Sequence, residues 1–274
     1  MPARGDDPAR AVSLRARLTR RLVAEGTIRS ERVAAAFQAV PRHLFVPRVP
    51  LRVAYADDVV PMKRDADGMV ISSVSQPSIV AVMLEQAAIR PDDHVLEIGS
   101  GGYNAALLRE LAGRVTTVDI DPDVVGRAHA GLRRAGYDDV RVVQADGEFG
   151  VPDDAPYDRI VVTVSAWDVP TAWVDQLTPG GRIVVPLRLG EQTRSVAFEE
   201  VAGHLESLSA VRCGFVNMQG VGAHPEDDVP DLRAWETAEL SVQAHRPGAE
   251  LPPGVHLVRR HHTFTVRRLA AAGS

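Results

Sequence analysis

The chain contains 274 residues, 45% of them hydrophobic, and carries a formal net charge of −5 at pH 7. This length allows one large α/β domain with appendages, and the acidic balance excludes a broad electrostatic attraction to nucleic acid. Cys213 is the only cysteine, which excludes an intramolecular disulfide, and no apolar run approaches the roughly 18 residues that a membrane span needs. The polar, Arg-rich start has no signal-peptide core. We therefore expect a cytoplasmic protein without membrane or nucleic-acid partners.

The N-terminal part predicts helices followed by an irregular segment. Apolar residues recur at helical spacing from Ser13 to Phe37, and Gly26 and Ser30 divide this stretch into two helices. Prolines punctuate the next segment, so we expect residues 40–62 to be irregular and to lie on the surface. Such a segment is suited to cap a site.

From residue 77 onward, predicted helices and strands alternate with short connections. The strands are 94–98, 115–118, 140–143, 159–164 and 182–187, and the helices are 77–87, 104–111, 123–135 and 170–177. This order is typical of a doubly wound, mostly parallel sheet with helices on both faces. The apolar runs RIVVTV and RIVVPL agree with strands that are buried on both sides.

The alternation stops after residue 187. Segments 195–200 and 205–212 predict antiparallel strands that complete the sheet edge, and residues 221–237 predict an acidic loop. Segments 238–245 and 255–266 predict a small β appendage. The basic stretch that contains His261 and His262 is interpreted as a solvated face, with docking of an acidic peptide as the alternative.

The strongest chemical signal is the segment VLEIGSGGYN, where a strand runs into a glycine-rich turn and then into a helix. Glycines such as Gly99 and Gly101 let the backbone approach a ligand, and a helix N-terminus presents free amides to it. Asp119 lies about 20 residues further on, at the end of the next strand, where a carboxylate accepts hydrogen bonds from ribose hydroxyls. Asp146 and Gly147 follow the third strand, on the same edge of the sheet.

The pattern favours S-adenosylmethionine over a nicotinamide dinucleotide. The dinucleotide fingerprint needs a third glycine where Asn104 stands, and Glu97 before the first glycine disfavours a pyrophosphate. A sulfonium cofactor with an amino-acid moiety tolerates acidic neighbours. A turn that only connects strand and helix is the remaining alternative, and the two spaced acids argue against it. The predicted cofactor-binding residues are Glu97, Gly99, Gly101, Asp119, Asp146 and Gly147.

Several segments in a fixed order resemble the protein-L-isoaspartate O-methyltransferase family, from about residue 17 to residue 218. They are VPRHLFVP at 40–47, AYAD at 54–57, SQP at 75–77, VLEIGSGGYNAALL at 95–108, APYDRIVVT at 155–163 and PGGRIVVPL at 179–187. The resemblance implies a Rossmann-like class I methyltransferase. It implies three parts: N-terminal helices and a substrate-side cap over 1–75, an S-adenosylmethionine-binding domain over 76–220, and an acidic linker with a small C-terminal β appendage over 221–274.

The resemblance also implies that Ser75 lies beside the substrate carboxylate, although a serine before Gln-Pro is also a good helix N-cap. Thr163, at the end of the fourth strand, is a candidate catalytic residue or a plain strand end. Tyr55 and Asp57 line the substrate groove or belong to an ordinary loop. Trp167 is a candidate neighbour of the methionine end of the cofactor.

Some features depart from the family. The glycine loop is one residue shorter than usual, the segment 69–74 looks rearranged, and the tail beyond 220 is additional. These departures resemble a subgroup found with lanthipeptides and graspetides, which methylates an aspartate in a precursor peptide. We therefore expect tailoring of a ribosomally made peptide, with repair of isoaspartyl residues in proteins as the alternative.

The expected reaction is esterification of an aspartyl or isoaspartyl side chain, which leads on to a succinimide. A carboxylate with a pKa near 4 is already a nucleophile at neutral pH, so no general base is needed. Alignment and exclusion of water remain for the protein, and Ser75 is suited to orient the carboxylate. No residues show metal-ligand spacing. A nucleotide-dependent oxidoreductase and a silent cofactor-binding protein remain as competing hypotheses.

Overall fold

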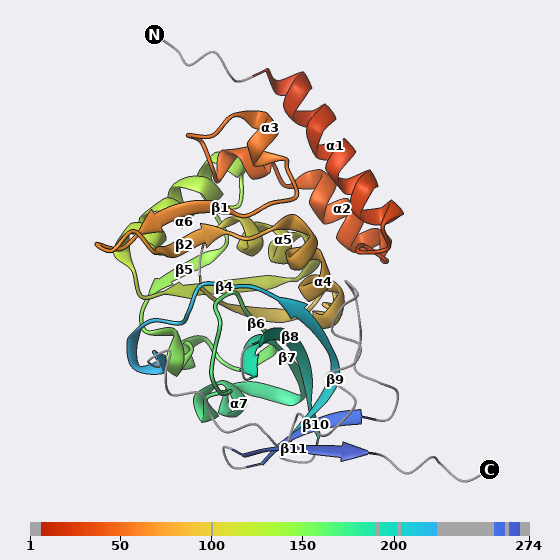
Figure 1. Ribbon diagram of the computed structural model, residues 1–274, viewed down its shortest axis with the longest axis vertical. Coiled ribbons are helices and arrows are strands. Elements are labelled where there is room, and N and C mark those ends of the chain that lie inside the picture. The colour runs from red at the N-terminus through yellow and green to blue at the C-terminus, as the bar shows by residue number, and fades with distance from the viewer. Residues whose placement is uncertain are drawn as a thin grey trace, which may run out of the picture.

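The computed structural model describes residues 7–99, 101–189, 192–201, 204–223, 255–260 and 263–268. Within these residues, the strands form a nine-stranded sheet of order β11-β10-β9-β8-β7-β6-β3-β4-β5 and a separate two-stranded sheet, β1-β2 (Figure 1). None of the described helices combines the length and the apolarity that crossing a membrane requires.

Five adjacent strands at one end of the large sheet are parallel, in the order β7-β6-β3-β4-β5. They are β3 (His94–Ile98), β4 (Arg114–Asp119), β5 (Arg141–Gln144), β6 (Tyr157–Val162) and β7 (Leu177–Leu189). The connecting helices are α4 (Pro77–Ala87), α5 (Tyr103–Leu111), α6 (Pro122–Ala135) and α7 (Thr171–Asp175). The sequence-based prediction of a doubly wound Rossmann-like sheet is confirmed, with boundaries that differ mostly by one to three residues.

Alternation along the buried strands divides the core between the two faces of the sheet. In β3, Val95 belongs to one apolar cluster and Leu96 to the other, because successive side chains of a strand point to opposite faces. The first cluster contains residues from α4 and α5, and the second contains Trp173 of α7. Strand order reverses at β3, which pairs with β4 on one side and β6 on the other. Ligands bind at such a switch point, outside the ends of the strands.

The antiparallel part continues the sheet beyond β7. Strands β8 (Gln192–Val201) and β9 (His204–Cys213) follow as predicted, and β10 (Val255–Arg260) pairs with β9. The segment expected as one strand over 255–266 is a hairpin of β10 and β11 (Thr263–Arg268), which pair with each other. Its predicted partner, 238–245, lies outside the described residues, as do His261 and His262.

The N-terminal helices are α1 (Pro8–Ala24) and α2 (Glu31–Ala39), which confirms the predicted break between Gly26 and Ser30. Each has a side-chain N-cap: Asp7 accepts from the amides of Ala9 and Arg10, and Ser30 accepts from that of Val33.

The expectation for residues 40–62 was wrong in part. This segment contains the short helices η1 (Arg42–Leu44) and α3 (Leu51–Ala54), and several of its side chains are buried, among them Val40, Phe45 and Tyr55. Prolines exclude long elements here, but they do not exclude burial of the apolar residues between them.

Residues 60–74 form a hairpin that the sequence analysis did not predict. Strands β1 (Val60–Arg64) and β2 (Val70–Val74) pair antiparallel, and this hairpin contains the segment 69–74 that departs from the family. In the turn, Oδ1 of Asp65 accepts from the amides of Asp67 and Met69, while Gly68 adopts a φ of 84°. Only glycine adopts that φ readily, so the Asp67-Gly68 pair was the available signal.

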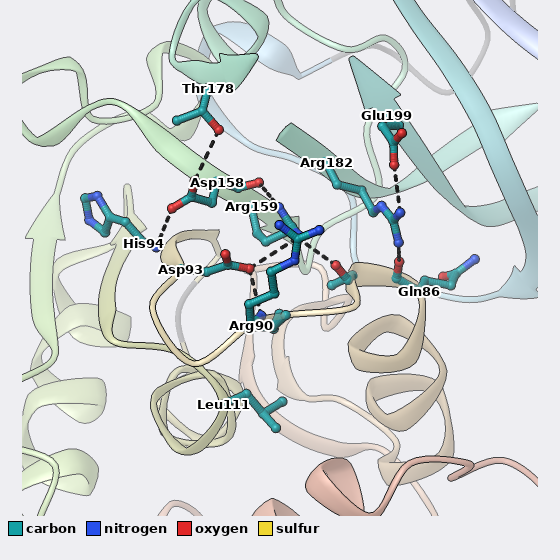
Figure 2. Close-up of polar contacts among 12 residues, drawn as sticks. Gln86, Arg90, Asp93, His94, Leu111, Asp158, Arg159, Thr178, Arg182 and Glu199 are labelled. Carbon is teal, nitrogen blue, oxygen red and sulfur yellow. Dashed lines mark hydrogen bonds and ion pairs between the residues drawn. The ribbon is translucent and has the colours of Figure 1, made fainter. Parts of the chain in front are cut away.

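At the edge where the parallel strands begin, here called the amino edge, charged side chains join the end of α4 to the sheet (Figure 2). Nε of Arg159 donates to the Ala87 carbonyl at 2.9 Å and lies 3.4 Å from Oδ2 of Asp93. Arg182 donates to the Gln86 carbonyl and pairs with Glu199 at 2.8 Å. The last carbonyls of a helix lack intrahelical donors, so cations stabilise this end of α4.

Candidate functional site

A pocket lies at the opposite edge, here called the carboxyl edge, where β3, β4 and β6 end. Glycines and loop residues that follow these strands form its floor. Its walls come from β2 and from the segment after β9. The predicted site residues on its lining are Gly99, Gly101, Asp119, Gly147 and Thr163. The pocket therefore lies at the switch point of the sheet.

The glycine-rich turn is held tightly against the neighbouring strand. Gly99 has a φ of 89°, and its amide donates to the carbonyl of Val118 at 2.9 Å. A Cβ at this position would lie 2.8 Å from Oγ1 of Thr163. That hydroxyl donates to the carbonyl of Gly99 at 2.8 Å, so Thr163 braces the turn. The position requires glycine for both its backbone conformation and its space.

Gly147 is a second glycine on the pocket lining, where only backbone atoms are present. A Cβ there would lie 2.7 Å from Cγ2 of Ile98. The Gly147 carbonyl accepts from Nε1 of Trp173 at 2.8 Å, which fixes the backbone below the pocket. At Gly101 a Cβ would make only ordinary contact, 3.9 Å from the carbonyl of Ser73 in β2. The β1-β2 hairpin thus runs along the glycine turn.

Asp119 is the acidic residue that the structure brings to the pocket. It ends β4, lines the pocket, and its Oδ1 accepts from the amide of Asp121 at 2.9 Å. Lys63 of β1 reaches the same region, where its Nζ lies 2.6 Å from Asp121 and 2.8 Å from Asp123. The hairpin is therefore also joined to the start of α6.

Asp146 is beside the pocket and not on its lining. Its Oδ1 accepts from the amide of Glu148 at 3.0 Å, and its Oδ2 accepts from the amide of Val221 at 2.8 Å. Gly220 packs directly on this carboxylate, because a Cβ there would overlap it. The structure therefore gives Asp146 a contact with the segment after β9, and its cofactor role stays a prediction.

Glu97 is buried within β3, with no exposed surface. Its Oε1 accepts from Nδ2 of Asn104 at 2.8 Å, and its Oε2 accepts from Oγ1 of Thr117 at 2.5 Å. Burial raises the pKa of Glu97 to about 7, although both hydrogen bonds oppose this rise. Glu97 does not line the pocket; it joins β3 to β4 and to the helix that follows the glycine turn.

The substrate-side predictions have different outcomes. Tyr55 is buried and its hydroxyl lies 2.7 Å from Nδ1 of His43, so the structure does not put it on the pocket lining. Asp57 and Ser75 are likewise absent from the lining. The predicted N-cap role of Ser75 is wrong: Gln76 occupies that position, and Asp57, from outside the helix, accepts from the amide of Ser78 in the first turn of α4.

Trp167 and Cys213 lie away from the lining of this pocket. Trp167 lines an adjacent hollow that also contains Phe149 and shares Met218 with the first pocket, and its ring lies 5.0 Å from the guanidinium of Arg188. Cys213 is half-buried, and burial raises the pKa of its thiol to about 12, so it is an inert side chain at neutral pH.

The sequence analysis missed two walls of the pocket. One consists of Ile71, Ser72 and Ser73 on β2, and the other is the segment 216–219 after β9. This second segment is bound through Ser165, whose amide donates to the carbonyl of Val216 and whose carbonyl accepts from the amide of Met218. These walls depend on contacts distant in sequence, so periodicity contained no signal for them.

Known proteins match this chain over most of its length. The family model "Protein-L-isoaspartate(D-aspartate) O-methyltransferase (PCMT)" matches residues 13–221. The protein-L-isoaspartate O-methyltransferase of Methanoculleus marisnigri is 45% identical over 194 residues, which cover 70% of this chain and 86% of that protein. The enzyme of Hyperthermus butylicus is 40% identical over 221 residues, covering 75% and 88%.

Solved structures agree with these relatives. A protein-L-isoaspartate O-methyltransferase is 25% identical with a TM-score of 0.69, covering 93% of this chain and 88% of that one. A Plasmodium falciparum homologue of that enzyme, in complex with S-adenosyl-L-homocysteine, has a TM-score of 0.61 at 16% identity, covers 74% and 97%, and supports the fold alone. With the relatives above, these matches show that the chain belongs to the protein-L-isoaspartate O-methyltransferase family of S-adenosylmethionine-dependent carboxyl methyltransferases.

Proposed function

We propose that this protein methylates the free α-carboxylate of L-isoaspartyl residues in proteins, as the first step of their repair. The observation that carries the proposal is the pocket at the switch point, floored by the bare backbone of Gly99 and Gly147 and bordered by Asp119. It occurs within residues 13–221, which the family model matches. The relatives named above are isoaspartate methyltransferases, so the comparisons favour repair and give no support to the tailoring expected from the sequence.

The pocket residues fit S-adenosylmethionine. Gly99 and Gly147 let their turns pack directly against Thr163 and Ile98, and a side chain at either position would displace a turn that lines the pocket. Asp119 at the end of β4 suits ribose hydroxyls. Gly99, Gly101, Asp119 and Gly147 would hold the cofactor, which supplies an electrophilic methyl group when it is bound.

The protein's own part in the reaction is alignment. The substrate carboxylate needs no general base, and among the described residues the pocket lining contains no histidine, lysine or cysteine. Ser75, just beyond β2, is proposed to donate to the carboxylate oxygen that does not attack. Walls from β2 and from the segment 216–219 are suited to shield a bound cofactor and substrate from water. In the ester, attack of the next backbone amide nitrogen on the carbonyl expels methanol and gives a succinimide, which water then opens.

Mass spectrometry of paired peptides tests this proposal. An isoaspartyl peptide and its aspartyl isomer are incubated separately with the protein and S-adenosylmethionine. We expect a methyl ester, or the loss of water that marks a succinimide, only on the isoaspartyl peptide. The same change confined to an aspartyl peptide would overturn repair in favour of tailoring. No change on either peptide, despite binding of S-adenosyl-L-homocysteine, would contradict methyl transfer to these carboxylates.

A further inference from the structure

The segment 74–78 joins β2 to α4 and contains Ser75, and a carboxylate from another part of the chain holds its far end. Oδ1 of Asp57 accepts from the amide of Ser78 at 2.8 Å, and its Oδ2 accepts from Nε2 of Gln76 at 3.4 Å. The Asp57 side chain is only 7% exposed. A buried carboxylate at a helix N-terminus satisfies the free amides there and interacts favourably with the helix dipole.

A buried cation holds the near end of the same segment. Arg42 has no exposed surface, and its guanidinium donates to the carbonyls of Ala54 at 2.9 Å, Asp58 at 3.3 Å and Val74 at 3.3 Å. Burying a guanidinium is costly unless hydrogen bonds compensate it. Here the carbonyls are those at the end of α3, before β1 and at the end of β2, so one side chain fixes all three connections.

The same guanidinium also contacts the cofactor side of the site. Its Cζ lies 4.8 Å from the ring centroid of Tyr103, the first residue of α5. Tyr103 directly follows Gly102, at the end of the glycine turn, and is itself buried. Arg42 therefore connects the segment before Ser75 with the helix that starts at the proposed cofactor site.

We propose that Arg42 and Asp57 are positioning residues, which hold the segment 74–78 so that Ser75 is aligned with the substrate carboxylate beside the glycine turn. This inference rests on the proposed function. Because Asp57 supplies the cap of α4, Ser75 is released from the capping role that its sequence position suggests. Methyl transfer depends on alignment, and a displacement of about 1 Å costs on the order of 100-fold in rate. A small shift of this segment would therefore appear in catalysis.

A double-mutant cycle tests the inference with whichever peptide of the pair the unchanged protein methylates. The variants are Asp57→Ala, Ser75→Ala and the double variant, measured at saturating peptide and cofactor. We expect each single variant to lower kcat by about 10- to 100-fold, and the double variant to be no slower than Ser75→Ala alone. Affinity for S-adenosyl-L-homocysteine, measured by calorimetry, should change by less than about threefold. Arg42→Lys should also lower kcat. Adding Ser75→Ala to Arg42→Lys should give a double variant that is no slower than Ser75→Ala alone.

Asp7→Ala is the matched control, because it removes an aspartate cap from α1, remote from the pocket. It should lower the melting temperature and leave kcat unchanged. If Asp57→Ala does not fold, Asp57→Asn, which keeps one acceptor oxygen, replaces it in the cycle. Multiplicative losses in the double variant would show that Asp57 acts independently of Ser75 and would overturn the inference. An unchanged protein that methylates neither peptide would instead contradict the proposed function.

Discussion

The two ends of the parallel strands use polar groups in different ways. At the amino edge, Arg159 and Arg182 contact helix carbonyls and carboxylates of the protein itself (Figure 2). At the carboxyl edge, Gly99 and Gly147 leave bare backbone around a pocket, with Asp119 on its wall. Groups that are satisfied within the protein stabilise the fold, whereas a surface that leaves room for a ligand serves binding. Mutations at the two edges should therefore separate stability from binding.

The largest effect on stability is expected from Arg159→Met. Arg159 and Asp93 are both buried, with side chains 8% and 9% exposed, and the substitution removes the cation while the carboxylate remains. Breaking a buried pair in this way costs about 3 to 5 kcal/mol. Urea unfolding should show this loss in the free energy of unfolding, while the folded variant binds S-adenosyl-L-homocysteine normally.

Arg133→Met is the control for this prediction. Arg133 and Asp138 are 80% and 71% exposed and lie 4.0 Å apart, so the loss should be less than about 0.5 kcal/mol. Equal effects of the two substitutions would contradict a structural role for the amino edge. A loss of cofactor affinity in Arg159→Met but not in Arg133→Met would contradict the inference that the amino edge serves stability and not binding.

The next largest effect is a change of stability with pH. Glu97 and Asp154 should contribute to it with opposite signs. Burial raises the pKa of Glu97 from 4.5 to about 7 in the folded protein. A raised carboxyl pKa disfavours the ionised form in the folded state, so stability should fall as pH rises from about 4.5 to about 7, by up to about 3 kcal/mol. Unfolding free energies at about pH 5 and about pH 8 should show this decrease in the unchanged protein and not in Glu97→Gln.

Asp154, near the amino edge, should behave in the opposite sense. Burial raises the pKa of its carboxyl, but a hydrogen bond from Thr116 and the charges of Arg114 and Arg141 outweigh burial and lower it overall. Its contribution to stability is therefore present at neutral pH and lost as pH falls below the ordinary value of 3.8. Asp154→Asn should leave the decrease between about pH 5 and about pH 8 intact. Removal of that decrease by Asp154→Asn would show that Glu97 is not its source.

A comparison of Gly99→Ala with Gly136→Ala should distinguish a steric effect on cofactor affinity from the effect of backbone strain on stability. In Gly99→Ala, the new Cβ would meet Thr163 at 2.8 Å and Val164 at 3.0 Å, so affinity for S-adenosyl-L-homocysteine should fall about 100-fold. Gly136→Ala is the matched control, because Gly136 has a φ of 84° and no atom within 4 Å of the added Cβ. It should cost about 1 kcal/mol of stability and no affinity. Equal loss of affinity in both variants would indicate that the site is sensitive to general destabilisation.

The parts of this arrangement that the sequence predicted are those encoded by local pattern. Buried parallel strands give continuous apolar runs, and a glycine between a strand and a helix indicates a tight turn or a close approach, so the sheet and Gly99 could be predicted. The wall at 216–219 and the contact of Asp146 with Val221 depend on residues distant in sequence, because the wall is bound through Ser165 and Val221 lies 75 positions from Asp146. The capping of α4 by Asp57 was missed for the same reason, since a local rule assigns that role to Ser75.

The smallest effect should come from matched threonines at the two edges. Oγ1 of Thr163 donates to the carbonyl of Gly99 at 2.8 Å, and Oγ1 of Thr178 donates to Oδ1 of Asp158 at 3.2 Å. Substitution of either by valine keeps the shape and removes the hydroxyl, which in Thr163 also lies 3.2 Å from the carbonyl of Ile98, at a cost of about 1 kcal/mol of stability. Only Thr163→Val removes the brace of the glycine turn, so only this variant should lose affinity for S-adenosyl-L-homocysteine, by about threefold to tenfold in calorimetry. A comparable loss in Thr178→Val would mean that disturbance at the amino edge reaches the pocket through the strands. Unchanged affinity in both variants would mean that the turn needs no brace from Thr163. The positive φ that glycine allows and the hydrogen bond from the Gly99 amide to the Val118 carbonyl would then be sufficient.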